Sequence, residues 1–234
     1  MINFRGVVGG YTWVTMAASS EEWTSILTPI LSGINRYNPN NIECLEMYVQ
    51  FQVENPSVYN LEANLSLMKL YQFNPNHFNV DIVCKMLLKS IMALPKIHLA
   101  LLISVLPLNQ QSNEEVVKIN SLCSHLESCS FTEFWSLVEE CGEIISKVVG
   151  FKDAVKNYIA ELVNITYQTI PVPQLSSYLG NMPEKELEQF AVSNGWKIND
   201  GVVFIRGQEE LIKPKRILAK IDFESVSNII SSTR

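Results

Sequence analysis

Residues 183–205 read PEKELEQFAVSNGWKINDGVVFI, and this stretch decides the fold of the C-terminal part of the chain. Its first half spaces apolar residues as on one face of a helix and stops at the Asn-Gly pair at 194–195. Its second half places two short β-type runs around the Asn-Asp-Gly turn at 199–201, which is a strong hairpin signal. A shorter helical run ends just upstream at Gly180. Helix, turn, helix and hairpin is the order of a winged helix, which we predict here.

Upstream of this stretch, residues 20–170 show one helical pattern after another, separated by Asn-Pro pairs at 38–39, 55–56 and 74–75. Seven or eight antiparallel helices with short polar turns predict a HEAT-like helical domain, although no residue-level repeat is present. The segment Pro171-Val172-Pro173 breaks this pattern. We therefore expect a mainly α protein with three parts. They are a flexible leader (1–19), a HEAT-like domain (20–170), and a winged-helix domain with a small β-hairpin and a C-terminal helix (171–234).

Local signals predict where some helices begin. We expect Ser20 to cap the first helix, and Ser112 and Ser130 to open two later helices as S-x-x-E capping boxes with Glu115 and Glu133. The run 96–106 is apolar almost all round, which predicts a short buried helix.

Composition limits the function. Of 234 residues, 47% are hydrophobic and 18% are charged, which argues against general disorder. The balance of 18 basic and 24 acidic residues gives a net charge of −6. A protein whose main task is binding nucleic acid is usually basic, because contacts with phosphate dominate the affinity for nucleic acid. The sequence therefore indicates a globular chain that acts mainly on something other than nucleic acid.

Signals of catalysis, cofactors and membrane insertion are missing from the sequence. It has no P-loop, G-x-S-x-G, G-x-G-x-x-G or H-E-x-x-H motif, and its three histidines lie far apart. Five scattered cysteines without a C-x-x-C pair suit reduced thiols in a cytoplasmic protein. No apolar stretch is long enough to span a bilayer. We expect no enzyme activity, no metal, no cofactor and no membrane contact.

The charge of the predicted winged helix argues against DNA binding. Its second helix carries Glu184, Glu186 and Glu188 against Lys185, and phosphate would repel that face. We therefore expect no sequence-specific DNA contact and interpret the module as a protein-docking one. One basic cluster follows and is a candidate for a weak contact with RNA or an acidic partner: Lys213, Lys215, Arg216 and Lys220.

The C-terminal end is rich in large apolar residues for a chain terminus. Chain ends fray unless something covers them, and an amphipathic helix can be covered by a partner's groove. Ile217 and Ile221 could equally pack on the winged helix itself. The predicted docking residues are Phe223, Val226, Ile229 and Ile230.

Several stretches along residues 20–234 resemble one known family in collinear order. They are Ile34-Asn35-Arg36-Tyr37-Asn38-Pro39, Leu61-Glu62-Ala63-Asn64-Leu65, Lys69-Leu70-Tyr71-Gln72-Phe73-Asn74-Pro75, Phe134-Trp135, Gly150-Phe151 with Asp153, Ile165-Thr166-Tyr167-Gln168, Ile212-Lys213-Pro214-Lys215, and Lys220-Ile221-Asp222-Phe223 with Ser225-Val226-Ser227. The sequence thereby resembles the K-subunit family of eukaryotic translation initiation factor 3, a family of PCI-type scaffold subunits.

The resemblance implies a HEAT-like domain followed by a winged helix, with no catalytic residues. It also implies a peripheral subunit that pairs chiefly with the L subunit. It further implies membership of a complex that binds the small ribosomal subunit and messenger RNA.

The residue patterns by themselves leave alternatives open. One is a scaffold subunit of another PCI-type assembly, such as a proteasome lid. Another is a winged-helix regulator that binds nucleic acid, and an enzyme comes third.

Overall fold

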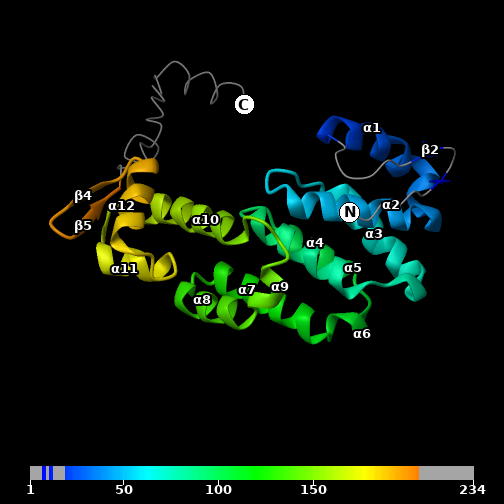
Figure 1. The fold of residues 1–234 in the computed structure, drawn as a ribbon. Helices are drawn as coiled ribbons and strands as arrows, with labels where there is room; N and C mark the ends of the chain where they lie inside the picture. Colours follow the sequence, from blue (N-terminus) through cyan, green and yellow to red (C-terminus); the bar gives the residue numbers. More distant parts are fainter. Residues whose placement is uncertain (1–6, 9–10, 13–18, 206–234) are drawn as a thin grey trace, which may run out of the picture.

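The computed structural model describes residues 7–8, 11–12 and 19–205. Figure 1 shows an elongated molecule in which α1 to α9 form a helical body and β3, α11, α12, β4 and β5 form a smaller unit at the other end, with α10 between them. The predicted mainly helical fold with a winged helix is confirmed. Two short strands, β1 (Val7–Val8) and β2 (Tyr11–Thr12), pair antiparallel within the segment expected to be a flexible leader.

The first half of the body consists of four helices joined by tight turns. The helices are α1 (Ser20–Leu31), α2 (Ile42–Glu54), α3 (Leu61–Phe73) and α4 (Val80–Met92). The turns include three 3-10 segments: η1 (Gly33–Tyr37), η2 (Pro39–Asn41) and η3 (Pro75–His77). Asparagines explain several of these starts, because Asn60 and Asn79 accept backbone N–H bonds from the first turns of α3 and α4.

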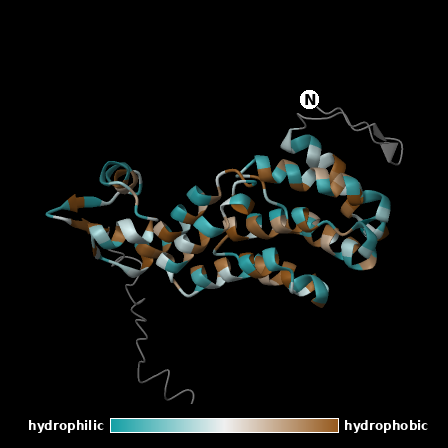
Figure 2. Cartoon of the chain, turned by 60° about the horizontal axis from the view of Figure 1, so that its bottom comes forward, coloured by the Kyte–Doolittle hydropathy of each residue, from teal (hydrophilic) through white to brown (hydrophobic). Residues whose placement is uncertain are grey.

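The second half continues the antiparallel arrangement with shorter helices. They are α5 (His98–Val105), α6 (Leu108–Gln111), α7 (Glu114–Glu127), α8 (Phe131–Glu140), α9 (Gly142–Ile145) and α10 (Phe151–Thr166). Figure 2 shows hydrophobic residues mostly where helices face one another and hydrophilic residues on the outer faces. Within the described residues, no helix combines the length and apolar character needed to cross a membrane.

The predicted caps need correction. Ser19, not Ser20, caps α1, in a reciprocal capping box with Glu22. Asn113 takes the place predicted for Ser112 and accepts the backbone N–H of Glu115. Ser130 does precede α8, but its side chain makes no capping bond. The first two errors have the same reason: a cap needs an extended backbone at one residue, and neighbouring polar residues compete for that position.

The prediction of a short buried helix over 96–106 is only partly correct, because the helix forms as α5 but buries one side alone. Only Leu99 and Leu102 of α5 are buried, whereas Leu101 and the preceding Ile97 are exposed. α5 packs against α3 and α4, and none of the described elements covers its opposite face. Helix α5 is therefore apolar around most of its circumference but buried only on the side that faces α3 and α4.

Helix α4 is the centre of the body. It packs against α2, α3, α5, α7 and α10. Even Lys89, near its C-terminal end, is buried, and its Nζ donates to the carbonyl oxygens of Asn55 and Pro56, both at 3.1 Å. These bonds satisfy two carbonyls in the turn between α2 and α3, so the lysine ties that turn to the central helix.

The small unit has winged-helix topology. Its elements are β3 (Thr169–Pro171), α11 (Val172–Tyr178), α12 (Glu184–Ser193), β4 (Lys197–Asn199) and β5 (Val202–Phe204). The strand order is β3-β5-β4, all antiparallel, with Val203 between Ile170 and Ile198 in the centre. The predicted hairpin is confirmed. Asp200 and Gly201 both have positive φ, as a two-residue type I′ turn requires.

Strand β3 was not foreseen in the sequence. Pro171, interpreted as part of a break, ends this strand, and Val172 begins α11. A proline fits there because β3 lies at the edge of the sheet. The division of the chain at residues 170 and 171 stays a prediction.

Lys89 generates a testable dependence of stability on pH. Burial lowers the pKa of Lys89 from 10.5 to about 8. Between these two values the unfolded chain binds more protons than the folded chain, so the contribution of Lys89 to the free energy of unfolding increases as the pH rises. We expect the wild type to gain up to about 3 kcal/mol over Lys89→Met between about pH 7.5 and pH 10.5.

Urea unfolding of both proteins at each pH measures this difference. The buried thiols titrate in the same range, but they are common to both proteins and cancel in the comparison. A difference that stays constant with pH would contradict the prediction.

Candidate docking surfaces

The residues predicted to dock partners lie outside the described residues. This holds for the apolar set Phe223, Val226, Ile229 and Ile230 and for the basic set Lys213, Lys215, Arg216 and Lys220. The surfaces that can be built from contacts therefore belong to residues 19–205. They lie on the winged helix and on the helical body.

The acidic face predicted on the second winged-helix helix is exposed to solvent. Glu184, Glu186 and Glu188 of α12 all have exposed side chains, and Lys185 beside them is the only basic residue of the helix. Leu187 and Ala191, one helical turn apart, are buried against the module's core. The helix that would enter a DNA groove therefore presents carboxylates, which repel phosphate.

The outer face of the winged-helix sheet carries an apolar residue that sequence reasoning did not single out. Phe204 of β5 is 45% exposed, whereas its neighbour Val203 is buried on the inner face. A cavity of about 490 Å³ lies beside it, lined by Gly195, Lys197, Phe204 and Ile205. β4 forms one edge of this sheet. An edge strand next to an exposed aromatic ring is a usual docking surface for a segment of another protein.

The winged helix is fixed to the helical body through Trp135 of α8. Its indole Nε1 donates to the carbonyl oxygen of Tyr178 at 2.8 Å, and the Tyr178 ring packs edge-on against Phe131 at 5.2 Å between centroids. On the other side, Trp196 Nε1 donates to Asn164 Oδ1 of α10 at 2.6 Å. The two units are therefore joined by packed aromatic side chains, and their surfaces have a set orientation.

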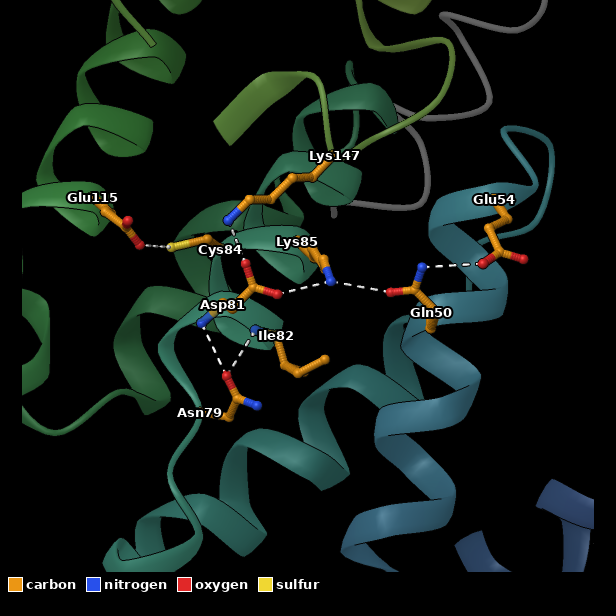
Figure 3. Close-up of polar contacts among 9 residues, drawn as sticks. All are labelled: Gln50, Glu54, Asn79, Asp81, Ile82, Cys84, Lys85, Glu115 and Lys147. Atoms are coloured by element: carbon orange, nitrogen blue, oxygen red, sulfur yellow. Dashed lines mark hydrogen bonds and ion pairs between the residues drawn. The ribbon is translucent and has the colours of Figure 1, made fainter. Parts of the chain in front are cut away.

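Figure 3 shows a cluster of ionisable and polar side chains at the start of α4. Asp81 lies between Lys147, at 2.6 Å, and Lys85, at 2.8 Å, and Lys85 also donates to Gln50 of α2 at 3.1 Å. Burial disfavours the Asp81 carboxylate, but hydrogen bonds and charge from Lys147 and Lys85 hold its pKa below the ordinary value. An aspartate held ionised by two lysines joins α2, α4 and the segment before α10, which is a structural task.

The thiols in the body are poorly suited to nucleophilic chemistry. Burial, with the hydrogen bond to Glu115 and its charge, raises the pKa of Cys84 to about 12. Burial and Glu127 likewise raise the pKa of Cys123 to about 12, and burial raises that of Cys44 to about 11. All five cysteines are free, and Cys129 alone of them is exposed. Because the thiolate is the reactive form, these buried thiols are inert near neutral pH.

A metal centre finds no support among residues 19–205. No group of three or more His, Cys, Asp or Glu side chains there could hold a metal ion. The ring of His98 stacks on Tyr59 with centroids 5.5 Å apart, and burial together with the charge of Lys96 lowers the His98 pKa. This histidine therefore takes part in packing.

These features define a mainly helical protein in which a winged helix follows the helical body, with several exposed surfaces on both. The model of the CSN8/PSMD8/EIF3K family matches residues 77–216, which is more than half of the chain, and the chain belongs to that family. Among its relatives, eukaryotic translation initiation factor 3 subunit K of Homo sapiens is 38% identical over 218 residues, covering 93% of this chain and 100% of the relative.

Relatives from other animals agree. The subunit K of Nematostella vectensis is 38% identical over 209 residues, covering 89% of this chain and 96% of the relative. That of Bombyx mori is 35% identical over 212 residues, covering 91% and 97%. The family resemblance found in the sequence is confirmed.

The packing around Trp135 leads to a prediction at Gly180. This glycine has a φ of +80°, and a Cβ added there would lie 2.9 Å from Trp135 Cδ2. Gly195 has a similar φ of +75°, but nothing lies within 4 Å of its added Cβ. Gly195→Ala should therefore cost only the strain of a left-handed alanine, about 1 to 2 kcal/mol. Gly180→Ala should cost about 1 to 3 kcal/mol more, because Trp135 must move.

Urea unfolding followed by tryptophan fluorescence compares the two variants directly. Equal losses of stability in the two variants would show that the Trp135 side chain moves at no cost, which would contradict the tight packing between α8 and the winged helix.

Proposed function

We propose that the chain is a non-catalytic scaffold subunit of eukaryotic translation initiation factor 3, acting in the cytoplasm through contacts with the other subunits. The observation that carries this proposal is the match to subunit K of Homo sapiens over 93% of this chain and the whole of the relative. The alignment spans both the helical body and the winged helix, so the proposal concerns the complete arrangement of the described residues.

The finer parts of the proposal concern partners. The L subunit is the chief neighbour, and contact with the small ribosomal subunit is made through the complex. The exposed glutamates of α12 and the β4 edge, which no other described strand pairs with, support a role in binding proteins and not in reading DNA. The domain division 20–170 and 171–234 belongs to the same proposal.

Two surfaces beyond residue 205 complete the proposed docking apparatus. Phe223, Val226, Ile229 and Ile230 form an apolar stripe that a partner helix covers. Lys213, Lys215, Arg216 and Lys220 supply a weaker contact with RNA or an acidic partner.

A second candidate follows from the breadth of the matched family. Its description joins CSN8 and PSMD8 with EIF3K, so a subunit of a different assembly, such as a proteasome lid, is the alternative. The relatives at 35–38% identity all bear the name of subunit K, which favours the first candidate.

Affinity purification of the tagged full chain from its own cells separates the two candidates. We expect mass spectrometry to find initiation-factor subunits, with the L subunit among the most abundant. Recovery of proteasome-lid subunits instead would favour the alternative, and recovery of neither would count against both.

The C-terminal stripe gives a prediction with a matched control. The triple variant Val226→Asp, Ile229→Asp and Ile230→Asp should leave the melting temperature of the isolated chain nearly unchanged but reduce recovery of the L subunit at least fivefold. The control adds the same charge to the same segment without removing apolar groups: Ser227→Asp, Ser231→Asp and Ser232→Asp. Loss of folding in the first variant alone would place the stripe in the chain's own core and contradict the docking role.

A further inference from the structure

An exposed aromatic pair lies at the end of the body formed by η1 and the end of α3, away from the winged helix (Figure 1). Tyr37 is 46% exposed and Phe73 is 64% exposed, and their rings meet edge-to-face with centroids 6.2 Å apart. Ile34, in the same turn as Tyr37, is 85% exposed. The three side chains, called here the aromatic patch, leave much of their apolar surface in water.

The backbone that carries the aromatic patch is firmly held. Arg36 donates from Nε and Nη2 to the carbonyl oxygen of Leu31, at 3.0 and 2.7 Å, and pairs with Glu62 of α3. Asn41 Nδ2 donates to the carbonyl oxygen of Asn35 at 2.9 Å. These bonds order η1 although its apolar side chains point into solvent. Exposed apolar side chains on an ordered backbone are typical of surfaces that bind a partner, because little conformational entropy is lost on binding.

A polar cavity lies within a few residues of both parts of the aromatic patch along the chain, although the patch residues themselves do not line it. Tyr37 directly precedes the turn before η2, and Phe73 precedes the turn before η3. Residues of η2 and η3 line a cavity of about 910 Å³. Its walls include the carboxylates of Glu43, Glu46 and Asp81.

The carboxylates of this cavity are not all neutralised. Asp81 has its two lysines, but among the described residues no basic side chain forms an ion pair with Glu43 or Glu46. Glu46 accepts a hydrogen bond from the Tyr71 hydroxyl, and burial together with that carboxylate raises the Tyr71 pKa. The exposed Glu43 is left to face solvent. The cavity therefore favours a cationic group over an anionic one.

We propose that the aromatic patch and this cavity together bind a basic peptide segment of a partner protein. An apolar or aromatic residue of the segment covers Tyr37, Phe73 and Ile34. A lysine or arginine a few residues away enters the cavity beside Glu43 and Glu46. RNA is the disfavoured occupant, because its phosphates would meet these carboxylates. This surface is separate from the proposed contacts of the winged helix and the C-terminal stripe.

A selection with a defined probe tests the proposal. A display library of random 12-residue peptides is selected on the immobilised full chain and, in parallel, on the Ile34→Ser, Phe73→Ser variant. Both substitutions are at exposed positions, so the variant should keep the wild-type circular dichroism and melting temperature. A matched control replaces two exposed apolar residues elsewhere, Leu108→Ser and Val192→Ser.

We expect peptides enriched on the wild type and the control, but not on the patch variant, to combine a large apolar residue with a nearby lysine or arginine. For the best peptide, labelled with fluorescein, anisotropy should give a Kd that rises at least fivefold in the patch variant. Glu43→Gln should raise it at least threefold, whereas Glu184→Gln should leave it unchanged. Added salt should weaken the binding.

Three results would overturn the proposal. They are enrichment that is equal on the wild type and the patch variant, enriched peptides without basic residues, and a Kd that Glu43→Gln does not change. A fluorescein-labelled A12 RNA that bound the wild type and lost binding in the patch variant would assign the surface to nucleic acid instead. None of these outcomes depends on the proposed place of the chain in an initiation factor.

Discussion

The body of the molecule depends on the burial of one helix from all sides. Helix α4 is covered by α2, α3, α5, α7 and α10, so nearly all its side chains must be apolar or have internal partners. Lys89 meets this demand by donating to the carbonyls of Asn55 and Pro56. The same turn is held from a second direction, because the Val149 N–H donates to the Val53 carbonyl and Gly150 lies against Pro56. The central helix therefore sets the positions of two loops that are distant in sequence.

Much of this fold could be predicted from local signals. Asn-Pro pairs mark the turns, the 3.6-residue period marks the helices, and the turn at 199–201 marks the hairpin. What local signals could not supply was the number of neighbours that each element has. The outer face of α5 is open because no described element packs there, and β3 is visible only once its partner β5, thirty residues later, is in place.

The same distinction applies to the candidate surfaces. The acidic residues of α12 are read directly from the sequence, and the exposure of Glu184, Glu186 and Glu188 agrees with the expectation. The meeting of Tyr37 with Phe73 joins two stretches thirty-six positions apart, and the cavity beside them needs two turns and two helices. Such composite surfaces arise only from tertiary packing. The docking stripe and the basic cluster near the C-terminus fall outside the described residues and stay predictions.

The position of β5 in the middle of its sheet has a mechanical consequence. This strand is the last described element, and the Ile205 N–H that follows it donates to the Gln168 carbonyl just after α10. Because β5 runs antiparallel to β3, tension applied from the C-terminal side would enter and leave this strand pair at the same end, where Ile205 bonds Gln168, and would open its hydrogen bonds one after another from that end. The load would pass directly into α10 and so into the helical body. A pull from the C-terminal side would therefore first strain the hydrogen bond between Ile205 and Gln168, where the sheet joins α10.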